Sequence, residues 1–264
     1  MTGTGTQNDP YIVDTWPDFV TAIGTSGAYV KVADDTVWDM NSIAPEGIGR
    51  IYCTCTELDG NGAEIHNLYF NAAGEYGVFY MYNSVHDISF LDFLSKQDSS
   101  HYSHALINLS SGSNIQRVTF SGIVSGTYNH YIFDGVQYER FKNCSLNLKM
   151  QLGSGKVYIS DDNRSALGYF ENNHIVIDAT NAQLYNSDYG IHNDNSLVEI
   201  VRAEGYSEIL PRSNARSTIV RYDKGTEREK NYVFDAAGAW HEVTSAQLQD
   251  AVYLASIGFP IGVD

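Results

Sequence analysis

Ile65-His66-Asn67-Leu68-Tyr69-Phe70 is the stretch that decides the expected fold, because its pattern returns four more times along the chain. Apolar residues stand at its first, fourth and sixth positions, and Asn stands at the third. The five copies start 20, 30, 26 and 29 residues apart, an irregular period that excludes coiled coils and helical repeats of fixed length. The later copies, of which the last is the weakest, are Val85-His86-Asp87-Ile88-Ser89-Phe90, Ile115-Gln116-Arg117-Val118-Thr119-Phe120, Phe141-Lys142-Asn143-Cys144-Ser145-Leu146 and Phe170-Glu171-Asn172-Asn173-His174-Ile175.

The phase of this hexamer predicts a bend in the chain. Its first and fourth apolar positions cannot lie on one face of a straight strand, so the chain turns at or beside the third residue, where Asn and Asp tolerate the left-handed conformation. A coil with such bends, repeated every 20 to 30 residues, winds into a parallel β-helix. We expect Phe70, Phe90 and Phe120 to stack inside it, about 4.8 Å apart per coil. A two-layer sandwich would also have short strands, but its apolar residues would not change from one face to the other at the same position of every repeat.

The hexamer resembles the inner-strand signature of right-handed parallel β-helices of the pectate-lyase-like superfamily. The resemblance covers Ala28 to Arg221, which is most of the chain. It implies an all-β fold, a single-stranded right-handed parallel β-helix, which we expect to have about seven to eight coils. It says little about function, since this scaffold serves lyases, hydrolases, adhesins and phage spikes alike.

Both ends of the solenoid need caps, because unpaired terminal strands invite aggregation. Thr15-Trp16-Pro17-Asp18 and Thr244-Ser245-Ala246-Gln247 each predict the start of a short capping helix. Ile219 to Phe234 is typical of a charged hairpin with its turn near Lys224-Gly225. The expected division is an N-terminal cap with a short helix (1–27), the parallel β-helix (28–218), and a C-terminal hairpin with a capping helix (219–264).

Composition and charge exclude several classes of protein. Apolar residues make up 43% of the 264 residues, so the chain is not disordered. The net charge of −16 argues against binding to nucleic acid or insertion at an anionic membrane, and the 19 tyrosines favour strands. No signal peptide is visible within Met1–Pro10. Through residue 95 there are thirteen acids and two bases, which indicates either a solvated surface or packing between protomers with opposite-sign ends.

The sequence offers no catalytic or metal-binding motif, so no catalytic residue, metal or other cofactor is expected. The three cysteines do not form a paired framework. Ile51, Cys53 and Cys55 alternate onto one strand face, which predicts small buried hydrophobes. Asp59-Gly60-Asn61-Gly62 resembles a calcium loop, but its ligand alternation stops at Ala63, so a tight turn explains it better.

Aromatic and ionisable residues gather in the segments between the hexamers, which should stack along one side of a β-helix. Tyrosine faces suit sugar rings and carboxylates accept hydrogen bonds from hydroxyl groups, so these segments predict an extended glycan site. The other interpretation is that the loops are simply polar and that Tyr covers the strands. The candidate glycan-binding residues are His101, Tyr102, Tyr128, Tyr131, Asp161, Asp162, Arg164, Tyr189 and His192.

The two ends of the chain carry the functional expectation. The opening, Gly3 to Phe19, is similar to the start of β-helical surface and virion proteins from bacteria and their phages. The ending, Tyr253 to Gly262, is apolar, and it could face a trimer axis or cap the core. We expect a non-catalytic bacteriophage virion protein: a homotrimeric tail spike, tail fibre or head decoration subunit, which contacts other virion proteins and host surface polysaccharide. The alternatives are a polysaccharide depolymerase, either a lyase or a glycoside hydrolase, and a secreted or cell-surface bacterial adhesin.

Overall fold

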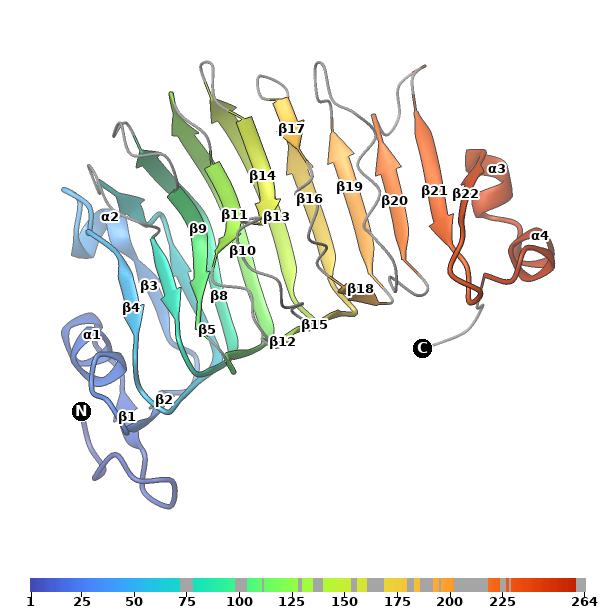
Figure 1. The fold of residues 1–264 in the computed structure, drawn as a ribbon. Helices are drawn as coiled ribbons and strands as arrows, with labels where there is room; N and C mark the ends of the chain where they lie inside the picture. Colours follow the sequence, from blue (N-terminus) through green and yellow to red (C-terminus); the bar gives the residue numbers. More distant parts are fainter. Residues whose placement is uncertain are drawn as a thin grey trace.

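The described residues form a mostly β structure with a few short helices, arranged as a β-solenoid of about four turns (Figure 1). This agrees with the expected parallel β-helix at the level of architecture. Among these residues, the helices are all too short to span a lipid bilayer. The computed structural model describes residues 1–71, 78–97, 104–110, 112–127, 130–134, 140–152, 156–160, 169–179, 183–185, 192–194, 196–201, 218–223, 227 and 229–259.

The strands form two sheets, in which parallel neighbours come from successive coils. In spatial order the main sheet contains β1 (Tyr11–Val13), β2 (Tyr29–Val32), β5 (Glu57–His66), β8 (Ser84–Gln97), β10 (Asn114–Gly126), β13 (Ser145–Leu152), β16 (His174–Asp178), β19 (Leu197–Val201), β20 (Ile219–Tyr222), β21 (Lys230–Phe234) and β22 (Trp240–Val243). Shorter strands joined to it are β3 (Val37–Asp39), β6 (Tyr69–Phe70), β12 (Arg140–Lys142), β15 (Tyr169–Glu171) and β18 (His192–Asp194). The second sheet contains β17 (Gln183–Tyr185), β14 (Lys156–Ser160), β11 (His130–Asp134), β9 (His104–Leu109), β7 (Phe79–Met81) and β4 (Ile51–Cys53).

The predicted bend is confirmed at the third position of all five hexamers. These residues have φ between 51° and 59°, in the left-handed region that Asn and Asp tolerate best. One of them is an arginine, which shows that the bend does not depend on an Asx side chain. The five residues are Asn67, Asp87, Arg117, Asn143 and Asn172.

The first hexamer, however, belongs to a different bend from the other four. Ile65 pairs with Phe90, whereas the residue that pairs with Val85 is Leu58. The bend of this coil is therefore the turn around Asn61, where extra residues separate the apolar positions and hide the pattern. With Leu58 as the start of the first copy, the interval to Val85 becomes similar to the later ones.

The predicted aromatic ladder is confirmed for two of its three members. The Phe90 and Phe120 rings stack with centroids 5.4 Å apart and an interplanar angle of 17°. Phe70 is not part of this ladder, because its partner in the sheet is Ser95. It packs instead against Phe79, with centroids 5.0 Å apart. All of these rings are buried and hold the coils together from inside.

The turn at Asp59-Gly60-Asn61-Gly62 serves chain reversal. Asn61 and Gly62 have φ of 52° and 81°, and the Asp59 Oδ1 accepts a hydrogen bond from the Asn61 N–H at 2.9 Å. A Cβ at Gly60 would lie 2.4 Å from the Cβ of Ile88 on the next coil, so only glycine permits this approach. The interpretation as a glycine-containing turn is confirmed.

Helices lie at the two opposite ends of the solenoid (Figure 1). At the N-terminal end, Thr15 caps α1 (Trp16–Ile23) and accepts a hydrogen bond from the Asp18 N–H, as predicted, and α2 (Met40–Ile43) follows later. At the other end, β20, β21 and β22 pair antiparallel, which confirms the hairpin.

The expected single C-terminal helix is two short helices, α3 (Ser245–Leu248) and α4 (Ala251–Ser256). The predicted capping box between Thr244 and Gln247 is present. The helix is interrupted because Asp250 begins a new one, its side chain accepting from the N–H groups of Val252 and Tyr253. The division of the chain into three parts stays a prediction.

The cysteines are buried, as predicted. Cys53 and Cys55 have no exposed surface, and their Sγ atoms lie 3.5 Å apart. The contact with Cys55, together with burial, raises the pKa of the Cys53 thiol. Burial raises the pKa of Cys144 to about 12. The Cys53 and Cys144 thiols therefore stay protonated, and all three buried cysteines pack as small hydrophobes.

Candidate functional site

The bends divide the main sheet into a wide part and a narrow one. The narrow part consists of the residues before each bend, and we call its outer surface the short-strand face. Apolar residues flanked by polar ones alternate along each of these short segments, so the polar side chains point outward. The face comprises the outward residues of 29–31, 57–59, 84–86 and 114–116, followed by those of β12 and β15. The backbone of β18 pairs with β15 at the C-terminal end of the face, and β12, β15 and β18 lie along the lower side of the solenoid in Figure 1.

Strand register aligns the outward residues of this face in two columns along the solenoid axis. One column consists of Glu57, Ser84, Asn114, Arg140 and Tyr169. The other consists of Lys31, Asp59, His86, Gln116, Lys142 and Glu171. Between the columns lie the buried residues Leu58, Val85, Ile115, Phe141 and Phe170. The face is therefore a polar strip on an apolar foundation.

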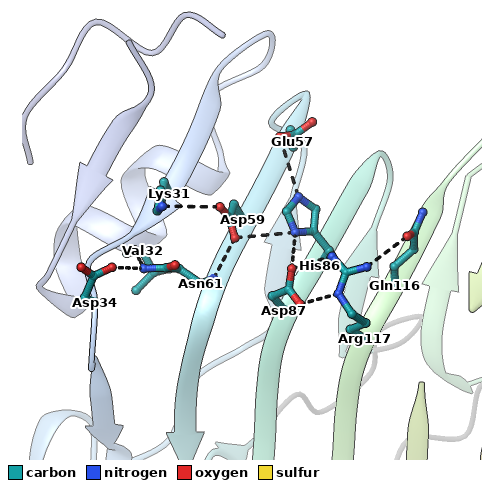
Figure 2. Close-up of polar contacts among 10 residues, drawn as sticks. All are labelled: Lys31, Val32, Asp34, Glu57, Asp59, Asn61, His86, Asp87, Gln116 and Arg117. Atoms are coloured by element: carbon teal, nitrogen blue, oxygen red, sulfur yellow. Dashed lines mark hydrogen bonds and ion pairs between the residues drawn. The ribbon is translucent and has the colours of Figure 1, made fainter. Parts of the chain in front are cut away.

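His86 is the centre of a group of carboxylates near the N-terminal end of this face (Figure 2). Its Nδ1 lies 2.9 Å from Asp87 Oδ2 and 3.6 Å from Asp59 Oδ1, and its Nε2 lies 3.7 Å from Glu57 Oε1. Lys31 approaches Asp59 from the preceding coil, with Nζ 3.9 Å from Oδ2. Three successive coils are thus joined through side chains.

Arg117 extends this group to the next coil. Its Nε and Nη2 donate to the two carboxylate oxygens of Asp87 at 2.5 and 2.6 Å (Figure 2). The Arg117 guanidinium, with help from His86, lowers the pKa of Asp87 to about 2. Asp87 is therefore ionised and paired at neutral pH.

Asp59, His86 and Asp87 are the residues that could hold a metal ion in the part of the chain that the structure describes. One ligand atom from each lies within 4.8 Å of the others. However, Arg117 already neutralises Asp87, and a bound cation would have to compete with that bidentate pair. The group is better explained as a connection between coils.

Farther along the face, the outward side chains surround a hollow of about 480 Å³, a size in the usual range of ligand pockets. It is lined by Asn114, Gln116, Arg140, Lys142, Tyr169 and Glu171. The Tyr169 side chain is 56% exposed, although its neighbour Phe170 is buried. Lys142 and Glu171 form an ion pair of 3.0 Å, and the Gln116 Nε2 donates to the Asn114 Oδ1 at 2.9 Å.

Arg140 differs from the other cations of the face. Its side chain is exposed and forms no hydrogen bond or ion pair in the described structure. It lies next to Tyr169 in register, on the neighbouring coil. The hollow therefore combines an exposed aromatic ring with an unpaired guanidinium.

The structure describes two of the predicted glycan-binding residues, and it does not bring them together. Tyr131 lies in β11 of the second sheet, half-buried, with Tyr158 as its partner in β14. His192 lies in β18, opposite Tyr169, at the C-terminal end of the short-strand face. Both are in strands, not in the loops where the sequence placed them. His101, Tyr102, Tyr128, Asp161, Asp162, Arg164 and Tyr189 lie outside the described residues.

The residues that line the hollow were not among the predicted ones, although a signal for them existed. Arg140 and Lys142 flank Phe141, and Tyr169 and Glu171 flank the next hexamer start in the same way. Comparing the positions beside the first apolar residue across the aligned hexamers would have placed them in shared outward columns.

A second group of aromatic residues lies at the other sheet, in which Tyr52 is exposed, Tyr82 is half-buried and Tyr80 is buried. Tyr52 and Tyr80 pair in register, with ring centroids 5.2 Å apart, and Tyr82 contacts both. Arg50 lies over the Tyr80 ring, 5.2 Å from its centroid. Burial and the neighbouring Tyr52 raise the pKa of Tyr82 to about 12. These rings pack chiefly against one another, so this group is less open to a ligand than Tyr169.

Comparison of the chain with protein-family models, with curated proteins and with solved structures found no match. The function of the short-strand face therefore has to follow from its own residues, and those described offer hydrogen-bonding groups, the exposed ring of Tyr169 and the unpaired guanidinium of Arg140 along a linear strip.

Proposed function

We propose that this chain is a structural protein of a bacteriophage particle, a tail spike, tail fibre or head decoration subunit, that binds host surface glycan on its short-strand face. The observation that carries the proposal is the hollow beside Tyr169. As part of the same proposal, the solenoid is right-handed, has about seven to eight coils and is related to the pectate-lyase-like β-helices. The repeated left-handed bends and the stacked inner rings support this finer description.

Sugar recognition suits the chemistry of the hollow. The exposed ring of Tyr169 can lie against the C–H face of a pyranose, while the amides of Asn114 and Gln116 and the carboxylate of Glu171 can bond its hydroxyl groups. The two columns continue from the hollow along the solenoid axis toward its N-terminal end. A linear polysaccharide could therefore contact several coils at once.

Binding without cleavage is favoured by the state of the carboxyl groups. A glycoside hydrolase needs a carboxyl group with a raised pKa as its general acid. The pKa of Asp18, Asp39, Asp87 and Asp235 is lowered, the opposite of what a general acid needs. Asp87 in particular, the carboxylate of the face that Arg117 holds ionised, is unsuited to donating a proton.

The proposed place in a virion rests on the ends and the charge of the molecule. Helices and antiparallel strands cover the ends of the solenoid, which protects the terminal strands from uncontrolled pairing. A strongly acidic chain stays soluble at high local concentration. We propose that it forms a homotrimer in contact with other virion proteins, located in the phage particle.

An array of purified bacterial lipopolysaccharides and capsular polysaccharides tests the glycan part of this proposal. We expect the protein to bind at least one polymer, and Tyr169→Ala to weaken that binding about tenfold. Tyr52→Ala, a change of the same type on the second sheet, should leave it unchanged. The bound polymer should gain neither reducing ends nor unsaturated-uronate absorbance. Absence of binding, or release of products, would contradict the proposal.

A further inference from the structure

Three cations lie on or beside the short-strand face on two neighbouring coils, Arg117 on one and Arg140 and Lys142 on the next, and only one of the three is open to a ligand in the described structure. Arg117 is held by Asp87, and Lys142 is held by Glu171 at 3.0 Å. Arg140 is exposed, lines the hollow and has no internal partner. The chain has 16 basic residues against 32 acidic ones. An unpaired guanidinium that lines a ligand-sized hollow can therefore select an anionic ligand on an otherwise acidic protein.

We propose that the hollow selects a sugar that carries a carboxylate, with the carboxylate on Arg140 and the ring on Tyr169; this rests on the proposed glycan binding. The planar guanidinium offers two parallel N–H groups that match a carboxylate. Arg140 and Tyr169 are paired residues on adjacent strands, so their side chains leave the sheet about 4.8 Å apart. That spacing lets one substituted pyranose contact both.

The local charge favours a monoanionic group. Because the charges of Lys142 and Glu171 cancel, the lining residues that the structure describes have one net positive charge, that of Arg140. A single carboxylate balances it, whereas a phosphate dianion would leave a surplus negative charge beside Glu171. Glu171 and the amides of Asn114 and Gln116 remain for the hydroxyl groups.

The test uses an array of acidic and neutral bacterial polysaccharides, together with a carboxyl-reduced copy of each acidic polymer. We expect the wild-type protein to bind an acidic polymer, and carboxyl reduction to weaken this binding about tenfold or more. Arg140→Gln should weaken it to a similar degree and should remove the effect of carboxyl reduction. Arg140→Lys, which keeps the positive charge but not the two parallel N–H donors of the guanidinium, should give an intermediate affinity.

The matched control is Lys149→Gln, which removes one exposed positive charge from β13, beyond the bend. It should bind the acidic polymer as the wild type does. If a polymer binds but neither carboxyl reduction nor Arg140→Gln weakens the binding, the selection of acidic sugars is wrong and glycan binding still stands. If no polymer binds, both proposals are wrong.

Discussion

At the residue scale, the fold depends on single positions with left-handed backbone, and two of them also bear charges that join coils. Asp87 and Arg117 have φ of 56° and 51° and occupy the same bend on adjacent coils. Their side chains then lie side by side and pair through two hydrogen bonds. The same residues therefore set the direction of the chain and the contact between turns.

Asp87→Asn should destabilise the protein by about 1 kcal/mol at pH 7, because the variant loses the ion pair but keeps a residue that tolerates the bend. The lowered pKa of Asp87 means that its contribution is present above the ordinary value of 3.8 and is lost as the pH falls toward about 2. Urea unfolding of both proteins should show the difference shrinking from pH 4 to pH 2.

Asp92→Asn is the control for this experiment. Asp92 also has left-handed backbone, with φ of 54°, but it is 71% exposed and faces His66 at 3.7 Å instead of an arginine. We expect a smaller change in the free energy of unfolding. An equal loss in both variants would mean that Arg117 does not stabilise Asp87.

Asn143 tests the backbone requirement separately from its side chain. Asn143 has φ of 55° and its Oδ1 accepts from Asn172 Nδ2 at 3.1 Å, a bond that Asn143→Ala and Asn143→Gly both remove. The alanine variant should be less stable than the glycine variant by about 1 kcal/mol in urea unfolding. At the exposed strand position Asn147, the order should reverse. The same order at both positions would contradict the bend.

At the element scale, stacked strands with an inner aromatic ladder account for the core. The hexamer pattern was enough to predict the bends and the Phe90–Phe120 stack, because both depend on local alternation. The pattern could not predict the place of Phe70, because the turn at Gly60 adds residues within that coil. The first hexamer therefore lies at the next bend of its coil, and Phe70 pairs with Ser95 instead of Phe90. Register between coils depends on such insertions, which local periodicity does not reveal.

The candidate site was harder to predict for the same reason. The pair of Asp87 with Arg117, and the neighbourhood of Arg140 and Tyr169, exist only because parallel register brings successive coils together. Of the two expected glycan-binding residues that the structure describes, only His192 lies in a strand that adjoins the short-strand face. Counting aromatic residues in the segments between repeats uses no register, so it could not identify the residues that successive coils bring together on this face.

Phe90→Ala should lower the free energy of unfolding by about 3–5 kcal/mol, because it opens a cavity between Phe120 and Phe79, whose ring centroids lie 5.4 and 4.9 Å from that of Phe90. Leu94→Ala on the same strand, where the side chain is 39% exposed, should cost much less. Urea unfolding measures both. A neutral Phe90→Ala would be incompatible with the ladder.

At the scale of the whole molecule, a linear polar strip and an acidic surface suit a protein that is displayed in several copies and meets a polymer. The proposed trimer would present three such strips together, and binding by several strips would raise the overall affinity. Light scattering at micromolar concentration should give three times the chain mass of 29.3 kDa. A mass of one chain would remove the trimer from the proposal while leaving the site intact.

The central claim is that a glycan binds over Tyr169, and carbene footprinting with and without a polysaccharide that the array identifies tests it most directly. Tyr169 and Tyr52 are 56% and 43% exposed and lie on different sheets, so each serves as a reference for the other. The polysaccharide should reduce labelling of Tyr169 and leave that of Tyr52 unchanged. Protection of Tyr52 without protection of Tyr169 would contradict the account.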